Sequence, residues 1–206
     1  MRRITGNVAE PPSGSPARRL LRSFTGRLFR GRVAAALVAL FVPVIVLANV
    51  GLPFSAAGIK EVSGGVGILD LEPAATAEGV GRALAAYGQE GRERYLVLLA
   101  SLDVLLPLLL ALTCAALLGV TLGRVRALRW TPLTPLVGLA ADYAENGVLA
   151  VLLTGYPSVP AGPAGLLSTL TAVKTTAIAV ELALVGAGLL YAALTRPARR
   201  RAGAVP

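Results

Sequence analysis

Four long apolar stretches alternate with short polar or basic segments along this chain. They cover residues 33–52, 95–122, 133–156 and 165–194. Each stretch reaches the ~20 residues that a helix needs to cross the hydrocarbon core of a bilayer. The pattern therefore predicts an all-α fold, a polytopic membrane protein in which residues 33–195 form a four-transmembrane-helix bundle.

The longest connection, residues 53–94, joins the first two stretches. Its first part, residues 54–67, is rich in Gly and Ser and is expected to be irregular. From residue 74 to 94, Val80, Leu84 and Tyr87 recur at helical spacing, which predicts an amphipathic outer helix that leads into span two at residue 95. Such a helix is either a connector that covers the outer end of the bundle or a lid over it.

Arginines are concentrated before the first stretch, between the second and third, and after the fourth. Lys and Arg near the ends of spans favour the cytoplasmic side, so both termini are expected to be cytoplasmic. On this basis residues 1–32 form a basic, partly disordered arm, and residues 196–206 form a basic tail. The alternative is a signal peptide cleaved after Ala57, but the apolar run exceeds the roughly 7 to 15 residues of a signal h-region.

Composition narrows the class of protein further. The chain is 55% apolar and 15% charged, with a mean hydropathy of +0.70, which excludes a soluble globular protein. Its net charge of +9 comes from arginines beside the spans. The chain has neither a motif that reads a nucleic-acid groove nor an aromatic-rich motif, so nucleic acid is not a predicted partner.

The Arg- and Ala-rich composition indicates a bacterial inner membrane. With no His and only Cys114, no disulfide, zinc site, other metal or cofactor is predicted.

Ionisable residues inside the apolar stretches are the most informative feature. Asp103, Asp142, Glu145 and Lys174 each lie where a charge costs ~2.5 to 3.5 kcal/mol to insert. At ~1.5 Å of rise per residue, all four lie ~12 to ~16 Å below the outer surface. Three spans therefore bring their charges to one level.

Helical spacing places these residues on shared faces. Asp142, Glu145 and Asn146 share one face of span three, and Thr171, Lys174 and Glu181 share one face of span four. Pro107 frees a backbone carbonyl one turn back, beside Asp103. We therefore expect a polar centre between spans two, three and four. Its residues are Asp103, Asp142, Glu145, Asn146 and Lys174, with Thr171 and Glu181 at the periphery.

Two interpretations of this centre remain open. Three carboxylates and one ammonium leave an excess of negative charge, so either protons are retained on the acids or cations are bound. Alternatively, Lys174 pairs with one acid and the other groups only fix the packing of the helices. Glu181 either pairs or reaches the cytoplasmic interface, or it takes part in a proton path.

The chain resembles a family of uncharacterised bacterial four-helix integral membrane proteins. The resemblance covers residues 33–194, and its most distinctive element is Asp-Tyr-x-Glu-Asn at residues 142–146 of the third span. The other elements that carry it are Gly67-Ile68-Leu69-Asp70-Leu71, Tyr87-Gly88-Gln89-Glu90-Gly91-Arg92 with Tyr95, Asp103 with Pro107, and Lys174. It implies topology and site positions but no chemistry, and it adds Gly88, Gly91, Arg92 and Tyr95 to the outer mouth of the site.

These observations predict a membrane protein whose polar centre binds a lipid-like or cationic small ligand. The alternatives are a membrane-embedded acid/base enzyme acting on a lipid or isoprenoid, a small proton-coupled transporter, and a non-catalytic accessory or sensor subunit. No residue is assigned a catalytic role. The expected partners are membrane lipids and a small molecule, and the pattern is compatible with a homo-oligomer.

Overall fold

The computed structural model describes residues 31–50, 52–71, 76–123 and 125–202, with side chains described as far as Thr195. The described chain is helical and contains no strand. Four segments are long and apolar enough to cross a membrane, namely Gly31–Asn49, Ala77–Thr121, Arg126–Gly155 and Ala161–Thr195. The predicted all-α multi-pass bundle is therefore confirmed. The predicted basic arm lies outside the described residues, apart from Gly31 and Arg32.

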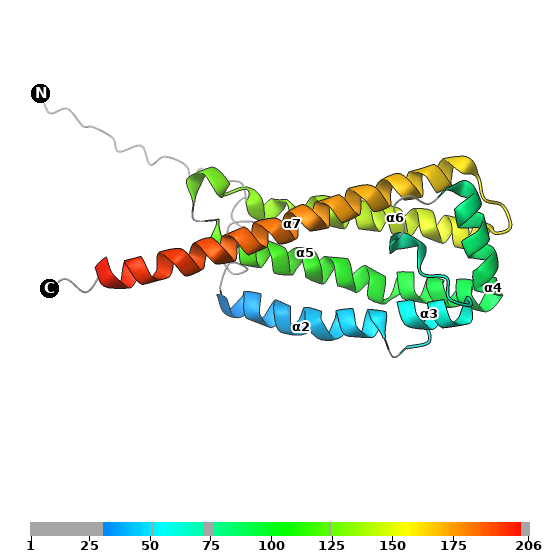
Figure 1. Ribbon diagram of the computed structural model, residues 1–206, viewed down its shortest axis with the longest axis horizontal. Helices are drawn as coiled ribbons and strands as arrows, with labels where there is room; N and C mark the ends of the chain where they lie inside the picture. Colours follow the sequence, from blue (N-terminus) through cyan, green and yellow to red (C-terminus); the bar gives the residue numbers. More distant parts are fainter. Residues whose placement is uncertain (1–30, 51, 72–75, 124, 203–206) are drawn as a thin grey trace, which may run out of the picture.

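The bundle consists of four helices that run along the long axis of the molecule (Figure 1). They are α2 (Gly31–Asn49), α5 (Leu102–Thr121), α6 (Pro135–Gly155) and α7 (Ala161–Ala202). Helix α6 packs along α7, α2 packs along α5, and α5 joins the two pairs. With 42 residues, α7 is ~63 Å long at ~1.5 Å per residue, and it continues through the predicted basic tail as far as Ala202.

Helix α2 presents most of its apolar surface to the surroundings. Its buried residues are Ala34, Val44 and Ala48, which face the bundle. Large exposed side chains cover the rest of the helix, among them Val38, Leu40, Val42, Ile45, Val46 and Leu47. A continuous apolar surface of this kind is unfavourable in water and favourable against lipid. The exposure pattern thus agrees with a membrane-spanning role for α2.

Helix α4 (Ala77–Ala100) crosses the end of the bundle opposite the C-terminus and then turns into the bundle (Figure 1). The turn occurs at Gly88, whose φ of 62° is accessible to glycine at little cost. The predicted outer helix is present, but the chain changes direction at Gly88, before the predicted entry at residue 95. A second break follows at Ser101, whose hydroxyl donates to the Val97 carbonyl at 2.5 Å.

The expectation that residues 54–67 are irregular is wrong, because α3 (Ala56–Val62) lies within them. Ser55 caps this helix by accepting from the Gly58 backbone N–H at 3.2 Å. Gly58 is required for the close turn, since a Cβ there would lie 2.4 Å from the Pro53 carbonyl oxygen. Ile59 is completely buried and anchors the helix. The alternative cleavage position, Ala57, lies inside α3.

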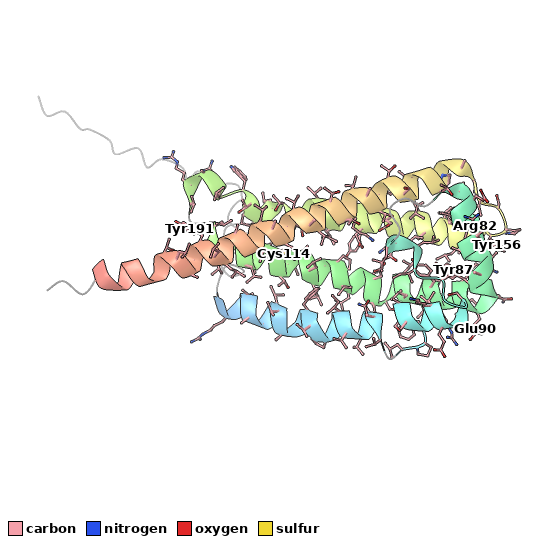
Figure 2. All side chains as sticks on the ribbon, in the orientation of Figure 1. Arg82, Tyr87, Glu90, Cys114, Tyr156 and Tyr191 are labelled. Carbon is pink, nitrogen blue, oxygen red and sulfur yellow. The ribbon has the colours of Figure 1, made fainter. Side chains whose placement is uncertain are left out.

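The first half of α4, residues 77–87, packs across the ends of α6 and α7, with α3 against α4 and the short helix η1 (Leu69–Leu71) against α7. Together these three segments form a cap on this end of the bundle. Burial of each large apolar side chain there is worth roughly 1.5 to 3 kcal/mol. In Figure 2, Arg82, Tyr87 and Tyr156 mark this end of the molecule, and Cys114 and Tyr191 lie in the other half. The buried core of the cap includes Ile59, Leu69, Val80, Leu84, Tyr87, Tyr95, Leu149, Leu152 and Leu167.

A second apolar cluster joins α5 and α7 farther from the cap. It contains Cys114, Leu118, Leu122 and Val185. The helices approach closely here at Gly188, where a Cβ would lie 2.5 Å from Thr121 Oγ1. On α7, Lys174 falls between Leu167 of the cap core and Val185 of the second cluster.

Candidate functional site

Lys174 is the centre of the buried polar cluster. It lies on α7 with 5% of its surface exposed. Its Nζ atom is 3.6 Å from Asp70 Oδ2, 3.7 Å from Asp142 Oδ1, and in closer contact with Glu145 Oε2. Three segments of the chain, η1, α6 and α7, thus meet at one ammonium group. Lys174 therefore pairs with both acids of span three as well as with Asp70 of the outer loop.

Glu145 is fully buried on α6 and is held from α7 by two residues one turn apart. Its Oε2 pairs with Lys174, and its Oε1 lies against the Thr171 hydroxyl. The same hydroxyl is 2.9 Å from the Leu167 carbonyl oxygen. A hydroxyl has one proton to donate, so Thr171 donates either to Glu145 or to Leu167. In the second case, Thr171 is free to accept a hydrogen bond from Glu145.

Asn146 ties α6 to the start of α5. Its Nδ2 donates to Asp142 Oδ2 and to the main-chain carbonyl of Asp103, both at 3.3 Å. Pro107 has no N–H to offer that carbonyl, which is why it is available to Asn146. The sequence pattern had located this freed carbonyl, and the structure identifies its partner. Tyr143 makes a parallel contact, because its hydroxyl donates to the Val104 carbonyl at 2.8 Å.

Asp70 is the member of the cluster that the bundle pattern missed. It lies in η1, in the loop between spans one and two, and is buried. Its Oδ1 accepts from the Tyr95 hydroxyl at 3.0 Å, its backbone N–H donates to that hydroxyl at 3.3 Å, and its Oδ2 pairs with Lys174. In the sequence, the only sign that Asp70 is buried is that this acid stands among the apolar residues Ile68, Leu69 and Leu71. The family resemblance includes this segment but assigns it no role.

Asp103 lies at the edge of the cluster. It is half-buried in the first turn of α5. The ion pairs of the described residues do not include Asp103, and its main-chain carbonyl accepts from Asn146.

The peripheral residues occupy different places. Tyr95 is completely buried, bonds Asp70 directly and packs edge-to-face on Tyr87 with ring centroids 5.7 Å apart. Arg92 does not reach the carboxylates. It lies over the Tyr156 ring, 4.4 Å from its centroid, and donates to the Leu84 carbonyl at 3.0 Å, across the kink at Gly88. Arg92 therefore stabilises the cap rather than the polar centre.

Glu181 lies on α7 about two turns, ~10 Å, beyond Lys174. Its surface is 3% exposed, so it does not extend to an interface. Within the described chain it forms no ion pair, and its Oε1 has no hydrogen-bond partner. Of the predicted residues, the structure therefore gathers Asp142, Glu145, Asn146, Thr171 and Lys174 closely. Tyr95 lies behind Asp70, and Glu181 lies farther along α7 without an ion pair to the cluster.

The described residues contain no group of three or more His, Cys, Asp or Glu side chains arranged to hold a metal ion. Instead, the Lys174 ammonium occupies the position between the carboxylates of Asp70, Asp142 and Glu145. Comparison with protein-family models, curated proteins and solved structures gives no match to this chain.

Proposed function

We propose that the polar centre binds a small primary-ammonium ligand in place of the Lys174 ammonium and in exchange with protons, so that the protein acts as a small proton-coupled transporter. The observation that carries this proposal is the charge balance. Three carboxylates lie within 4 Å of one buried ammonium. A single ion pair would be enough to hold two helices together, whereas an excess of buried acids requires protons or a cation.

The class of ligand follows from what the carboxylates already hold. An ammonium group offers three N–H donors and no acceptor. Asp70, Asp142 and Glu145 surround the Lys174 ammonium from η1 and α6. A primary amine in its protonated form presents the same charge and the same three donors. A quaternary ammonium ion has the charge without the donors, and it serves as the matched comparison.

Thr171 supports proton exchange at Glu145. Its hydroxyl lies between Glu145 Oε1 and the Leu167 carbonyl oxygen. When Glu145 is ionised, the hydroxyl donates to it. When Glu145 carries a proton, the hydroxyl accepts from Glu145 and donates to Leu167. Glu145 thus keeps a hydrogen-bond partner in both protonation states, as a group that gains and loses a proton requires.

A lipid-modifying enzyme is less well supported. The bundle has a lateral apolar groove of about 710 Å³, lined by residues of α2, α5 and α7 that include Ala35, Val120 and Leu189. Leu189 lies fifteen residues beyond Lys174, which is ~22 Å at ~1.5 Å per residue. The residues that line this groove do not include any member of the polar centre. The groove therefore does not favour acid/base chemistry on a lipid.

For orientation we propose a bacterial inner membrane with both termini in the cytoplasm, on the basis of the arginine asymmetry. The test is thiol labelling in intact cells, in a Cys114→Ala background. Lys60→Cys in the cap should react with a membrane-impermeant reagent, and Arg126→Cys should react only after the cells are opened. The reverse pattern would invert the proposed topology.

Transport is tested with purified protein in vesicles that contain a pH-sensitive dye and are acidic inside. Putrescine is a suitable probe, because it carries two primary ammonium groups and crosses bare bilayers slowly. Added outside, it should raise the internal pH faster than in protein-free vesicles, and tetramethylammonium should not. Glu145→Gln should abolish the response. If putrescine does not change the internal pH, the proposed transport function is wrong; if it also fails to raise the melting temperature of the protein, the proposed class of ligand is wrong as well.

A further inference from the structure

The unpartnered Oε1 atom of Glu181 is the feature that the polar centre leaves unexplained. A buried polar atom without a partner costs about 1 to 3 kcal/mol, and water commonly satisfies such atoms. The carboxyl of Glu181 faces α6, because a Cβ on Gly138 would lie 2.9 Å from Glu181 Oε1. Glycine at position 138 therefore leaves the space into which this carboxyl points.

A small cavity lies at this point between α5, α6 and α7. Asp142 and Glu181 both line it, and its volume, measured as space open to the centre of a water molecule, is about 10 Å³. A water molecule itself fills ~10 to 15 Å³, so space that is open to its centre can hold one, and it needs at least two polar partners. Of the lining residues, only Asp142 and Glu181 have polar side chains, so their carboxyl groups would be those partners. The other residues that line the cavity are Pro107, Leu110, Ala111, Pro135, Gly138, Leu139 and Ile178.

We propose that this cavity is a water site through which Asp142 and Glu181 exchange a proton, so that Glu181 is a second proton-binding group of the polar centre. The inference rests on the proposed function and extends it to a named residue. In the transfer, the O–H bond of a protonated Asp142 breaks as its proton forms a new O–H bond to water. The water releases another proton to the Glu181 carboxylate, and the reverse sequence restores the starting state.

The site extends the polar centre away from the cap. Asp142 already contacts Lys174 and Asn146, so a proton that arrives there comes from the cluster described above. Glu181 lies about two turns farther along α7, ~10 Å from Lys174. Beyond Glu181, Val185 belongs to the second apolar cluster. Glu181 is therefore the last buried acid before that cluster.

Two variants test the site without removing a member of the cluster around Lys174. Glu181→Gln keeps the size of the side chain but cannot bind a proton. Gly138→Ala adds a methyl group where the Glu181 carboxyl and the water would lie, and the flexible end of Glu181 can move aside. Gly147→Ala is the matched control, because it lies on the same helix and its added Cβ meets nothing within 4 Å.

The first readout is the infrared carbonyl stretch of a protonated carboxyl group. The difference between the parent and Glu181→Gln should contain one such band, which shifts in D₂O as the proton exchanges with water. Gly138→Ala should displace the band, and Gly147→Ala should not. If the difference spectrum contains no exchangeable carboxyl band at any pH at which the protein remains folded, the water site is wrong.

The second readout is proton flux driven by putrescine in vesicles. Because a positioned proton-transfer group contributes about 100-fold or more, Glu181→Gln and Gly138→Ala should slow the flux by that factor, and Gly147→Ala should leave it unchanged. If Glu181→Gln and Gly138→Ala both keep the flux of the parent while Glu145→Gln is inactive, the water site is wrong but the proposed function stands. An absence of flux in the parent overturns the proposed function, and the infrared band still decides the water site.

Discussion

The Tyr95 hydroxyl donates a hydrogen bond to Asp70 Oδ1 at 3.0 Å and so connects the cap to the polar centre. The bond joins residues that are 25 positions apart, and both are buried. Asp70 in turn reaches Lys174 with its other carboxylate oxygen. The loop between spans one and two is therefore part of the polar centre, and disturbance of the cap should alter the charge around Lys174.

Tyr95→Phe should destabilise the protein by about 1 to 3 kcal/mol, because the backbone N–H and Oδ1 of Asp70 both lose their partner while they stay buried. The measurement is the melting temperature in detergent, with Tyr191→Phe as the control, since Tyr191 is exposed on α7. Equal melting temperatures for Tyr95→Phe and the parent would show that the cap does not hold Asp70 in place.

Asn146 and Pro107 should be energetically coupled. Asn146→Leu removes the donor from the Asp103 carbonyl and from Asp142 Oδ2, which should cost about 1 to 3 kcal/mol. Pro107→Ala restores an N–H that can bond the Asp103 carbonyl within α5. The cost of Asn146→Leu should therefore be smaller in the Pro107→Ala background, by about 1 kcal/mol in a double-mutant cycle of unfolding free energies. Strict additivity would contradict the shared carbonyl.

Lys174→Ala should destabilise the protein by about 3 to 5 kcal/mol, because it leaves three buried carboxylates without their cation. Methylammonium should restore part of this loss, since it fits the vacated position and supplies three N–H donors. A concentration 100 times its Kd would return about 2.7 kcal/mol. Melting temperatures in methylammonium, tetramethylammonium and sodium chlorides provide the comparison. Equal effects of the three salts would refute recognition of a primary ammonium.

Glu145→Gln should separate binding from packing. The amide keeps the shape of the side chain and can still contact Thr171, so the folded protein should remain monodisperse, with a melting temperature near that of the parent. Binding of putrescine and the proton response should be lost. If Glu145→Gln instead loses about 3 to 5 kcal/mol of stability and Lys174→Met added to it restores folding and activity, the pair only holds the helices together.

Gly188→Ala should weaken the contact between α5 and α7. Its Cβ would lie 2.5 Å from Thr121 Oγ1 and 3.2 Å from Leu122 Cγ, and overpacking of this kind costs about 1 to 3 kcal/mol. Gly186→Ala is the matched control, because nothing lies within 4 Å of its added Cβ. Thermal unfolding of the two variants measures the difference. A Gly188→Ala protein as stable as Gly186→Ala would contradict the close packing.

Helical periodicity accounts for the part of the site that could be predicted. Asp142 and Glu145 are three residues apart, so any helix places them on one face, and their distance from the ends of the span sets their level in the bundle. The same reasoning placed Lys174 opposite them. The freed Asp103 carbonyl was also predictable, because proline lacks an N–H whatever surrounds it.

The position of Asp70 could not be predicted in this way. Its depth depends on how the loop folds back onto α7, and that path depends on the Gly88 turn, α3 and the Tyr95 hydroxyl. Glycine permits a turn without dictating its direction, so the pattern of residues 54–94 did not show which acid would enter the bundle.

Hydropathy and helical spacing, which are properties of neighbouring residues, determined the four helices, the membrane class and the common level of the charges. The tertiary structure decided which groups meet: Asp70 beside Lys174, Asn146 on the Asp103 carbonyl, and Glu181 buried against Gly138. The physical reason is that hydrophobic transfer acts on each segment separately, whereas a buried polar contact depends on the packing of segments far apart in the chain.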